Sequence, residues 1–151
     1  MQRDYEDEFI LRADNGHFYL KIIEVFGSPK TTSPWGGYDT KSSVEIISSN
    51  YSVKGELYIS TGELFTFFEQ LRICYETLKG KANLSSYEGN LKMDVLFDGL
   101  GHATVKGSYK ERLHTDNDLI FELTSDQTYI FQAVAGLRDI VSVYGDNSGV
   151  K

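Results

Sequence analysis

Most of this chain alternates apolar and polar residues with a period of two, and two segments change to a helical period. Residues 8–26 alternate around Asn15-Gly16, a dipeptide that favours a tight hairpin turn. If these two residues form the loop, the apolar side chains of both strands lie on one face. The facing pairs are then Phe9 with Ile22, Leu11 with Leu20, and Ala13 with Phe18.

Further hairpins are expected in two regions. Alternation resumes at Val44, turns near Ser49-Asn50 and continues to Ile59. Residues 81–123 alternate again, with turn residues at 88–90, 98–101 and 110–117. A five-residue loop over 98–102 is favoured over a three-residue one, because it sets Asp94 rather than Lys92 opposite Lys106.

Two helices are predicted, at about 61–79 and 125–144. Ser60 and Glu63 have the spacing of a capping box, and Gly80 supplies a left-handed stop. For the second helix, Thr124 is the expected N-cap, with Gln127 three residues later, and Gly145 marks the end. The apolar stripe of the first helix consists of Leu64, Phe67, Phe68, Leu71, Cys74, Tyr75 and Leu78.

Strands in hairpin-joined runs, interrupted by single helices, indicate an α+β domain. We expect an antiparallel sheet of seven or eight strands with both amphipathic helices packed on it. Residues 1–151 form one domain in this interpretation, because no linker or repeat divides the chain. The first seven and last six residues are expected to be frayed ends.

A formal net charge of −7 argues against nucleic-acid binding and against a polybasic membrane patch. Four acidic residues and one arginine among residues 1–8 account for much of this charge. The N-terminus has no apolar segment typical of a signal peptide, and no apolar run is long enough to cross a membrane, so a cytoplasmic protein is expected.

No catalytic, metal or cofactor site is predicted. His17, His102 and His114 lie in or beside predicted turns without further ligands at metal-binding spacing. Cys74, the single cysteine, sits in a helical apolar stripe and suits a buried thiol better than a nucleophile. Gly99-Leu100-Gly101 precedes a strand instead of a helix and therefore does not suit a phosphate loop.

The candidate partner-binding residues are Trp35, Tyr38, Asp39, Asp94 and Asp98. Aromatic residues on a long loop, here residues 27–41, are favoured as interface anchors. Trp35 is either such an anchor or a cover over an open end of the core. The two aspartates near the hairpin at 98–102 are interpreted mainly as solvated side chains on a strand surface.

Two segments go beyond generic patterning: LKGKANLSSYEGNLKMDVLFDGLGHATVKG at 78–107 and LIFELTSDQTYIFQAVAGLRDIV at 119–141. They resemble the WapI-type family of small bacterial immunity proteins. The matching positions are Gly80, Glu88, the alternating strand 91–97, Gly101, and the helix start at 126–129. Each of these residues has a structural role, so the resemblance indicates a fold family without transferring interface residues.

The resemblance implies a non-enzymatic cytoplasmic inhibitor that binds a toxin domain, monomeric or a weak homodimer. A nuclease toxin would present a basic cleft, which an acidic inhibitor can complement. A small-molecule or protein binding module without a toxin partner is the alternative. A third interpretation, an enzyme using Asp94, Asp98 and a histidine, requires these groups to converge in one cleft.

Overall fold

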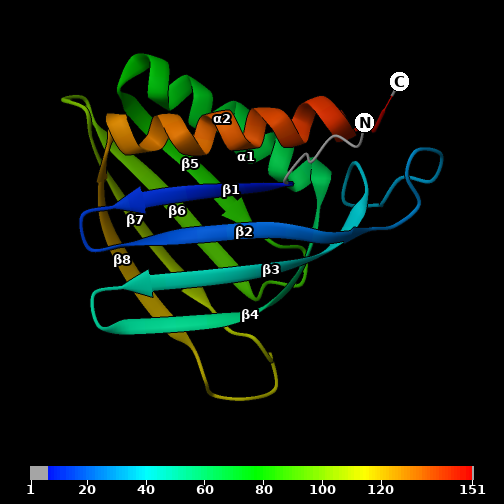
Figure 1. The fold of residues 1–151 in the computed structure, drawn as a ribbon, viewed down its shortest axis with the longest axis horizontal. Helices are drawn as coiled ribbons and strands as arrows, with labels where there is room; N and C mark the ends of the chain where they lie inside the picture. Colours follow the sequence, from blue (N-terminus) through cyan, green and yellow to red (C-terminus); the bar gives the residue numbers. More distant parts are fainter. Residues whose placement is uncertain (1–6, 151) are drawn as a thin grey trace, which may run out of the picture.

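The structure, a computed structural model, describes residues 7–150, and its elements run ββββαββββα along the chain (Figure 1). The strands are β1 (Glu8–Ala13), β2 (Gly16–Val25), β3 (Asp39–Ser48), β4 (Tyr51–Ser60), β5 (Lys79–Ser85), β6 (Leu91–Asp98), β7 (His102–Tyr109) and β8 (Leu119–Asp126). The helices are α1 (Thr61–Thr77) and α2 (Gln127–Tyr144).

The eight strands form two four-stranded antiparallel sheets, ordered β1-β2-β3-β4 and β5-β6-β7-β8. The strands of one sheet cross behind those of the other, and both helices lie along one side of the pair (Figure 1). The predicted α+β class and strand number are confirmed, but the strands divide between two sheets instead of forming one. The physical reason is α1, which separates β4 from β5 and carries the chain into the second layer.

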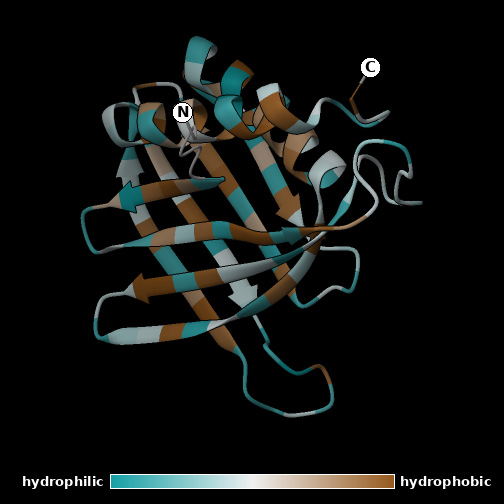
Figure 2. Cartoon of the chain, turned by 45° about the vertical axis from the view of Figure 1, so that its right-hand side comes forward, coloured by the Kyte–Doolittle hydropathy of each residue, from teal (hydrophilic) through white to brown (hydrophobic). Residues whose placement is uncertain are grey.

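The core lies between the two sheets and beneath the helices. Along each strand, hydrophobic and hydrophilic residues alternate (Figure 2), and the apolar ones are buried. Leu11 and Ile46 from the first sheet and Val105 and Leu123 from the second are fully inaccessible. The helix α1 adds Leu64, Phe67 and Leu71 to the same core cluster. None of the helices within residues 7–150 is long and apolar enough to span a membrane.

The first hairpin turns one residue earlier than predicted. Its register pairs Ala13 with Gly16, so the loop is Asp14-Asn15 rather than Asn15-Gly16. The apolar residues still share one face, because the pairing moves by two residues and the side-chain period is two. Gly16 is held inside β2 by close packing: a Cβ there would lie 1.8 Å from the carbonyl oxygen of Ile47.

The other registers agree with the sequence-based expectation. Residues 49–50 join β3 to β4, because Ser48 pairs with Tyr51. Residues 98–102 form the loop between the paired residues Phe97 and Ala103, and Asp94 lies opposite Lys106. The cross-strand charge pair therefore decided correctly between two loop lengths.

The capping box that starts α1 is confirmed, since the Glu63 N–H donates to the Ser60 Oγ at 3.1 Å. The predicted stop at Gly80 is wrong: Leu78, with φ 62°, is the C-cap, and Gly80 already belongs to β5. The predicted N-cap Thr124 is also wrong, because β8 continues through it to pair with β7. Asp126 caps α2 instead, and Gly145 ends this helix as expected.

The structure describes the chain from residue 7 to residue 150, which includes most of the C-terminal end. Residues 1–6 and 151, predicted to be part of the frayed ends, lie outside the described residues. Residues 146–150 form a turn closed by a bridge between Asp146 and Gly149. The Val150 N–H donates to the Tyr38 hydroxyl at 2.8 Å, which ties this turn to the loop before β3.

Candidate functional site

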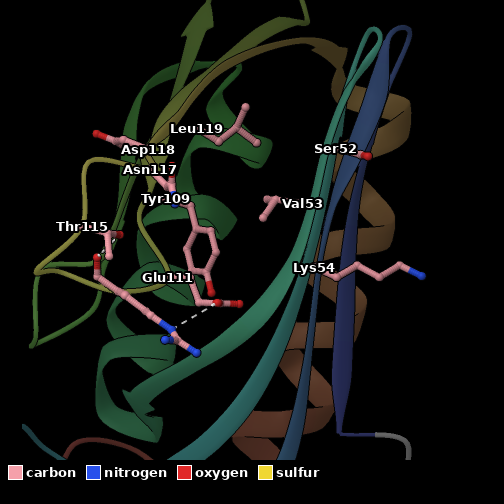
Figure 3. A pocket seen from close by; sticks show the side chains of 10 residues that line it. Ser52, Val53, Lys54, Tyr109, Glu111, Thr115, Asn117, Asp118 and Leu119 are labelled. Carbon is pink, nitrogen blue, oxygen red and sulfur yellow. Dashed lines mark hydrogen bonds and ion pairs between the residues drawn. The ribbon is translucent and has the colours of Figure 1, made fainter.

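The two helices cover one side of the pair of sheets, and the opposite side is open along β4. The contacts of α2 with β1 and of α1 with β5 protect these two edge strands. The outer edge of β4 instead borders a groove of about 670 Å³. Its other wall is formed by the end of β7, the loop 110–118 and the start of β8 (Figure 3).

A second hollow of about 450 Å³ continues this groove toward the loop between β5 and β6, and both hollows share Glu111 and Arg112. We call the two together the β4 groove. The first hollow is lined by Ser52, Val53, Lys54, Tyr109, Glu111, Arg112, Thr115, Asn117, Asp118 and Leu119. The second is lined by Glu56, Tyr58, Glu88, Asn90, Glu111 and Arg112.

Alternation along β4 decides which of its side chains enter the groove. Val53 points into it, whereas Lys54 points away to the outer face of the sheet (Figure 3). The Lys54 ammonium group pairs there with Glu45 at 3.3 Å. Gly55 has no side chain, and a Cβ at this position would lie 2.3 Å from the Tyr109 hydroxyl. This gap allows Tyr109 to reach the backbone of β4.

Tyr109 joins the two sheets at the middle of the groove. Its hydroxyl donates a 2.6 Å hydrogen bond to the carbonyl oxygen of Glu56. Burial raises the pKa of Tyr109 to about 12, and the negative charges of Glu111 and Glu56 add to this effect. The hydroxyl therefore remains protonated at neutral pH and acts as a hydrogen-bond donor to β4.

Electrostatically, the groove favours cations. Glu111 projects into it beside Tyr109 (Figure 3). Arg112 is the cation that lies there, since Lys54 points away, and its guanidinium is 3.9 Å from the Glu111 carboxylate. Glu88 lines the far end of the groove and is exposed.

Aromatic and acidic side chains gather at that far end. The Trp35 ring stacks on Tyr87, with ring centroids 5.4 Å apart and planes 3° from parallel. Burial raises the pKa of Tyr87 to about 12, with smaller contributions from the charges of Asp39, Glu88 and Glu63 and from Tyr58. We call this set, Trp35, Tyr58, Tyr87, Asp39, Glu63 and Glu88, the aromatic–acidic patch.

The loop that carries Trp35 is fixed by hydrogen bonds. The Trp35 N–H donates to the Ser33 Oγ at 3.1 Å, and the Ser33 hydroxyl donates to Asp39 at 2.8 Å. The N-cap residue Ser60 donates to the Trp35 carbonyl at 3.2 Å. Trp35 remains 56% exposed. Of the two roles considered from the sequence, a cover over the core therefore does not apply.

The five predicted partner-binding residues do not share one surface. Trp35 and Asp39 belong to the aromatic–acidic patch, whereas Tyr38 is fully buried and its hydroxyl donates to the Pro29 carbonyl at 2.9 Å. Asp94 and Asp98 lie on the outer face of β6. Asp98 is the last residue of β6. It lies seven residues, or about 23 Å, from the first residue of this strand.

The two aspartates make local structural contacts. Asp94 accepts a hydrogen bond from the Asn83 side chain at 2.9 Å. Asp98 accepts from the Leu100 N–H at 2.7 Å and pairs with His102 at 3.0 Å. The hydrogen bond from the Leu100 N–H lowers the pKa of Asp98, and His102 adds a smaller lowering. Asp98 and His102 therefore meet at an exposed turn, whereas Asp94 contacts Asn83 instead, and neither aspartate lines the β4 groove.

Several residues of the groove and of the aromatic–acidic patch were not identified from the sequence, including Tyr58, Tyr87, Tyr109 and Glu111. Tyr109 alternates with apolar residues like any core position, and the others occupy strand or turn positions. They come from segments far apart in the chain, so no local pattern could have grouped them. Within residues 7–150, no three potential metal ligands among His, Cys, Asp and Glu come together.

Comparison with known proteins gives one broad match. The model of the family described as "Immunity protein WapI-like family" matches residues 9–145. No curated protein shows significant similarity. Among solved structures, a chain of the CdiA-CT/CdiI toxin and immunity complex from Enterobacter cloacae is 13% identical, with a TM-score of 0.42. The match covers 78% of this chain and 99% of that one.

Proposed function

The chain belongs to the WapI-like immunity protein family, and we propose that it neutralises a bacterial toxin domain by binding it, without catalysis, through the aromatic–acidic patch. The stack of Trp35 on Tyr87 beside three carboxylates is the observation that carries this proposal. An exposed, fixed aromatic pair offers contact area at little entropic cost, because its loop is already ordered.

A basic toxin surface is the partner that this patch suits. Asp39, Glu63 and Glu88 lie around the aromatic rings, so a lysine or arginine can meet both a carboxylate and an aromatic face. Nuclease toxins present such cations because they bind phosphates. The proposed inhibition is steric and electrostatic: the inhibitor occupies the surface that the toxin needs for its substrate.

The groove is less suited to a small molecule. Its larger hollow has the volume of a ligand pocket. However, Val53, Tyr109 and Leu119 are the apolar or aromatic residues among the ten that line it, and the other seven are polar or charged. Ligand pockets are predominantly apolar. A protein partner therefore fits this side of the molecule better.

The test is binding to the toxin domain encoded beside the gene of this protein. We expect a stable complex with the wild-type chain and rescue of growth when both are co-expressed. Trp35→Ala should weaken the complex at least tenfold, because it removes the exposed half of the aromatic stack. Absence of any complex with the wild-type chain would refute the proposed function.

Phe131→Ala is the matched control for Trp35→Ala. Phe131 has the same exposure, 56%, and also contacts another aromatic ring, Tyr75, but lies on α2 outside the patch. This variant should bind the toxin like the wild type. Equal weakening by both variants would refute the assignment of the patch while leaving toxin binding intact.

A charge variant tests the basic character of the partner. Glu88→Gln should lower the association rate at low salt, and this difference should fade as salt screens the charges. Glu24→Gln, at an exposed position on β2, is the control that should leave the rate unchanged. An association rate that is independent of both salt and Glu88 would contradict a basic partner surface.

A further inference from the structure

The outer edge of β4 has unpaired backbone groups. In the hairpin of β3 and β4, Ser48 pairs with Tyr51 across a two-residue loop, so odd-numbered residues of β4 bond to β3. The N–H and C=O groups of Ser52, Lys54 and Glu56 consequently point to the other side, into the β4 groove. In the described part of the chain, one hydrogen bond is made to these edge groups: the Tyr109 hydroxyl donates to the Glu56 carbonyl.

The other edges of the two sheets are protected. The contacts of the helices cover β1 and β5. On β8, the loop of the first hairpin supplies partners: the Asp14 N–H donates to the Thr124 carbonyl at 2.8 Å. An edge strand that is left open presents a template for another strand. Here β4 is that strand.

We propose that β4 is the attachment site for an extended, basic segment of the toxin, which adds to the first sheet as a fifth strand. This proposal rests on the proposed function and adds the mode of contact. From Tyr51 to Glu56 the edge is about 17 Å long, enough for a strand of about five residues. The backbone hydrogen bonds supply affinity, and the groove reads alternate side chains.

The lining of the groove defines the segment. Val53 and Leu119 offer apolar contact at one position, whereas Glu111 offers a carboxylate beside Tyr109 (Figure 3). The matching strand therefore carries an apolar residue and, two positions along on the same face, a lysine or arginine. A second copy of this chain suits the groove poorly, because its own β4 lies beside Glu111 and Asp118, and pairing would bring like charges together.

Lys54 provides a test that separates backbone from side chain. Lys54→Pro removes the N–H that points to the groove and leaves the bonds to β3 intact, as proline on an edge strand does. Lys54→Ala removes only a side chain that points away from the groove. We expect Lys54→Ala to bind the toxin domain like the wild type, and Lys54→Pro to bind at least tenfold more weakly. Equal affinity of the two variants would overturn the proposal.

Hydrogen exchange on the wild-type complex gives a second measurement that needs no variant. The amides of Ser52 and Lys54 should exchange fast in the free protein and at least tenfold more slowly in the complex. The amides of Val53 and Gly55, already bonded to β3, should change much less. A toxin complex in which Ser52 and Lys54 still exchange fast would overturn strand addition without affecting toxin binding itself.

The charge of Glu111 and the oligomeric state of the free chain give two further tests. Glu111→Gln should weaken toxin binding about fivefold, with Asp116→Asn on the same loop as the control. Sedimentation of the free chain should show no dimer that depends on β4. A dimer that Lys54→Pro dissolves and Lys54→Ala does not would overturn the proposal, because a second copy would then occupy the edge.

Discussion

The hydroxyl of Tyr109, at the end of β7, donates a 2.6 Å hydrogen bond to the carbonyl of Glu56 in β4. It connects the two sheets on the side that the helices leave open. The absence of a side chain at Gly55 makes this contact possible, since a Cβ there would meet the hydroxyl at 2.3 Å. The contact therefore depends on residues from both layers of the fold.

Tyr109→Phe removes this bond and keeps the buried ring. We expect the free energy of unfolding to fall by about 1 kcal/mol, the typical net value of one hydrogen bond. Urea unfolding followed by circular dichroism measures this loss. A variant as stable as the wild type would mean that water replaces the hydroxyl as the partner of the Glu56 carbonyl.

Alkaline pH should weaken the wild type more than Tyr109→Phe. Burial raises the pKa of Tyr109 to about 12, above the unfolded value of about 10. The neutral hydroxyl therefore contributes stability in full below pH 10, and this contribution is lost as pH rises through 12. Unfolding free energies measured between pH 9 and 12 should converge for the two proteins. Parallel curves would contradict the assignment.

Asn15→Ala should loosen the contact between the first hairpin and β8. The Asn15 side chain accepts from the Thr124 N–H and donates to the Glu122 carbonyl, both at 3.0 Å. We expect a loss of about 1 kcal/mol, because water reaches this exposed site and compensates in part. Asn15→Asp retains the acceptor, so its melting temperature should lie between those of the wild type and Asn15→Ala. An unchanged melting temperature for Asn15→Ala would contradict the role of this side chain.

Ser60→Ala should destabilise α1 and release the loop that carries Trp35. The Ser60 hydroxyl caps the helix and also donates to the Trp35 carbonyl. Loss of an N-cap costs about 1 kcal/mol, and the second bond adds to it. Chemical denaturation measures the total, and faster amide exchange of residues 33–37 would show the release of the loop. A loss of stability without faster exchange would assign the whole effect to the helix.

Gly136→Ala sets helix propensity against packing. Alanine favours a helix by up to about 1 kcal/mol over glycine. At this position, however, the new Cβ would lie 2.8 Å from the Glu8 carbonyl oxygen and 3.0 Å from the Phe9 Cα. Backbone atoms of β1 cannot yield as side chains do, so we expect net destabilisation by about 1 kcal/mol. Ser142→Ala, an exposed control on α2, should change stability by less than about 0.5 kcal/mol.

Several local features were predictable because they depend on residues close in sequence. The capping box of Ser60 and Glu63 fixes the start of α1, and the alternation in β6 and β7 fixes which faces are buried. The predicted turn at Asn15-Gly16 failed for a tertiary reason. Gly16 is needed inside β2 for its close approach to Ile47, and Asn15 bonds to β8, about a hundred residues later in the chain.

The α+β class, the antiparallel hairpins and both helices follow from local patterns in the amino-acid sequence, because hydrophobic periodicity and capping act over a few residues. The sequence also carried the family pattern over residues 9–145. The division of the strands into two sheets, the contact of Trp35 with Tyr87 and the open edge of β4 depend on tertiary packing. These features arise where segments distant in sequence pack together, and packing partners leave no periodic signal in either segment.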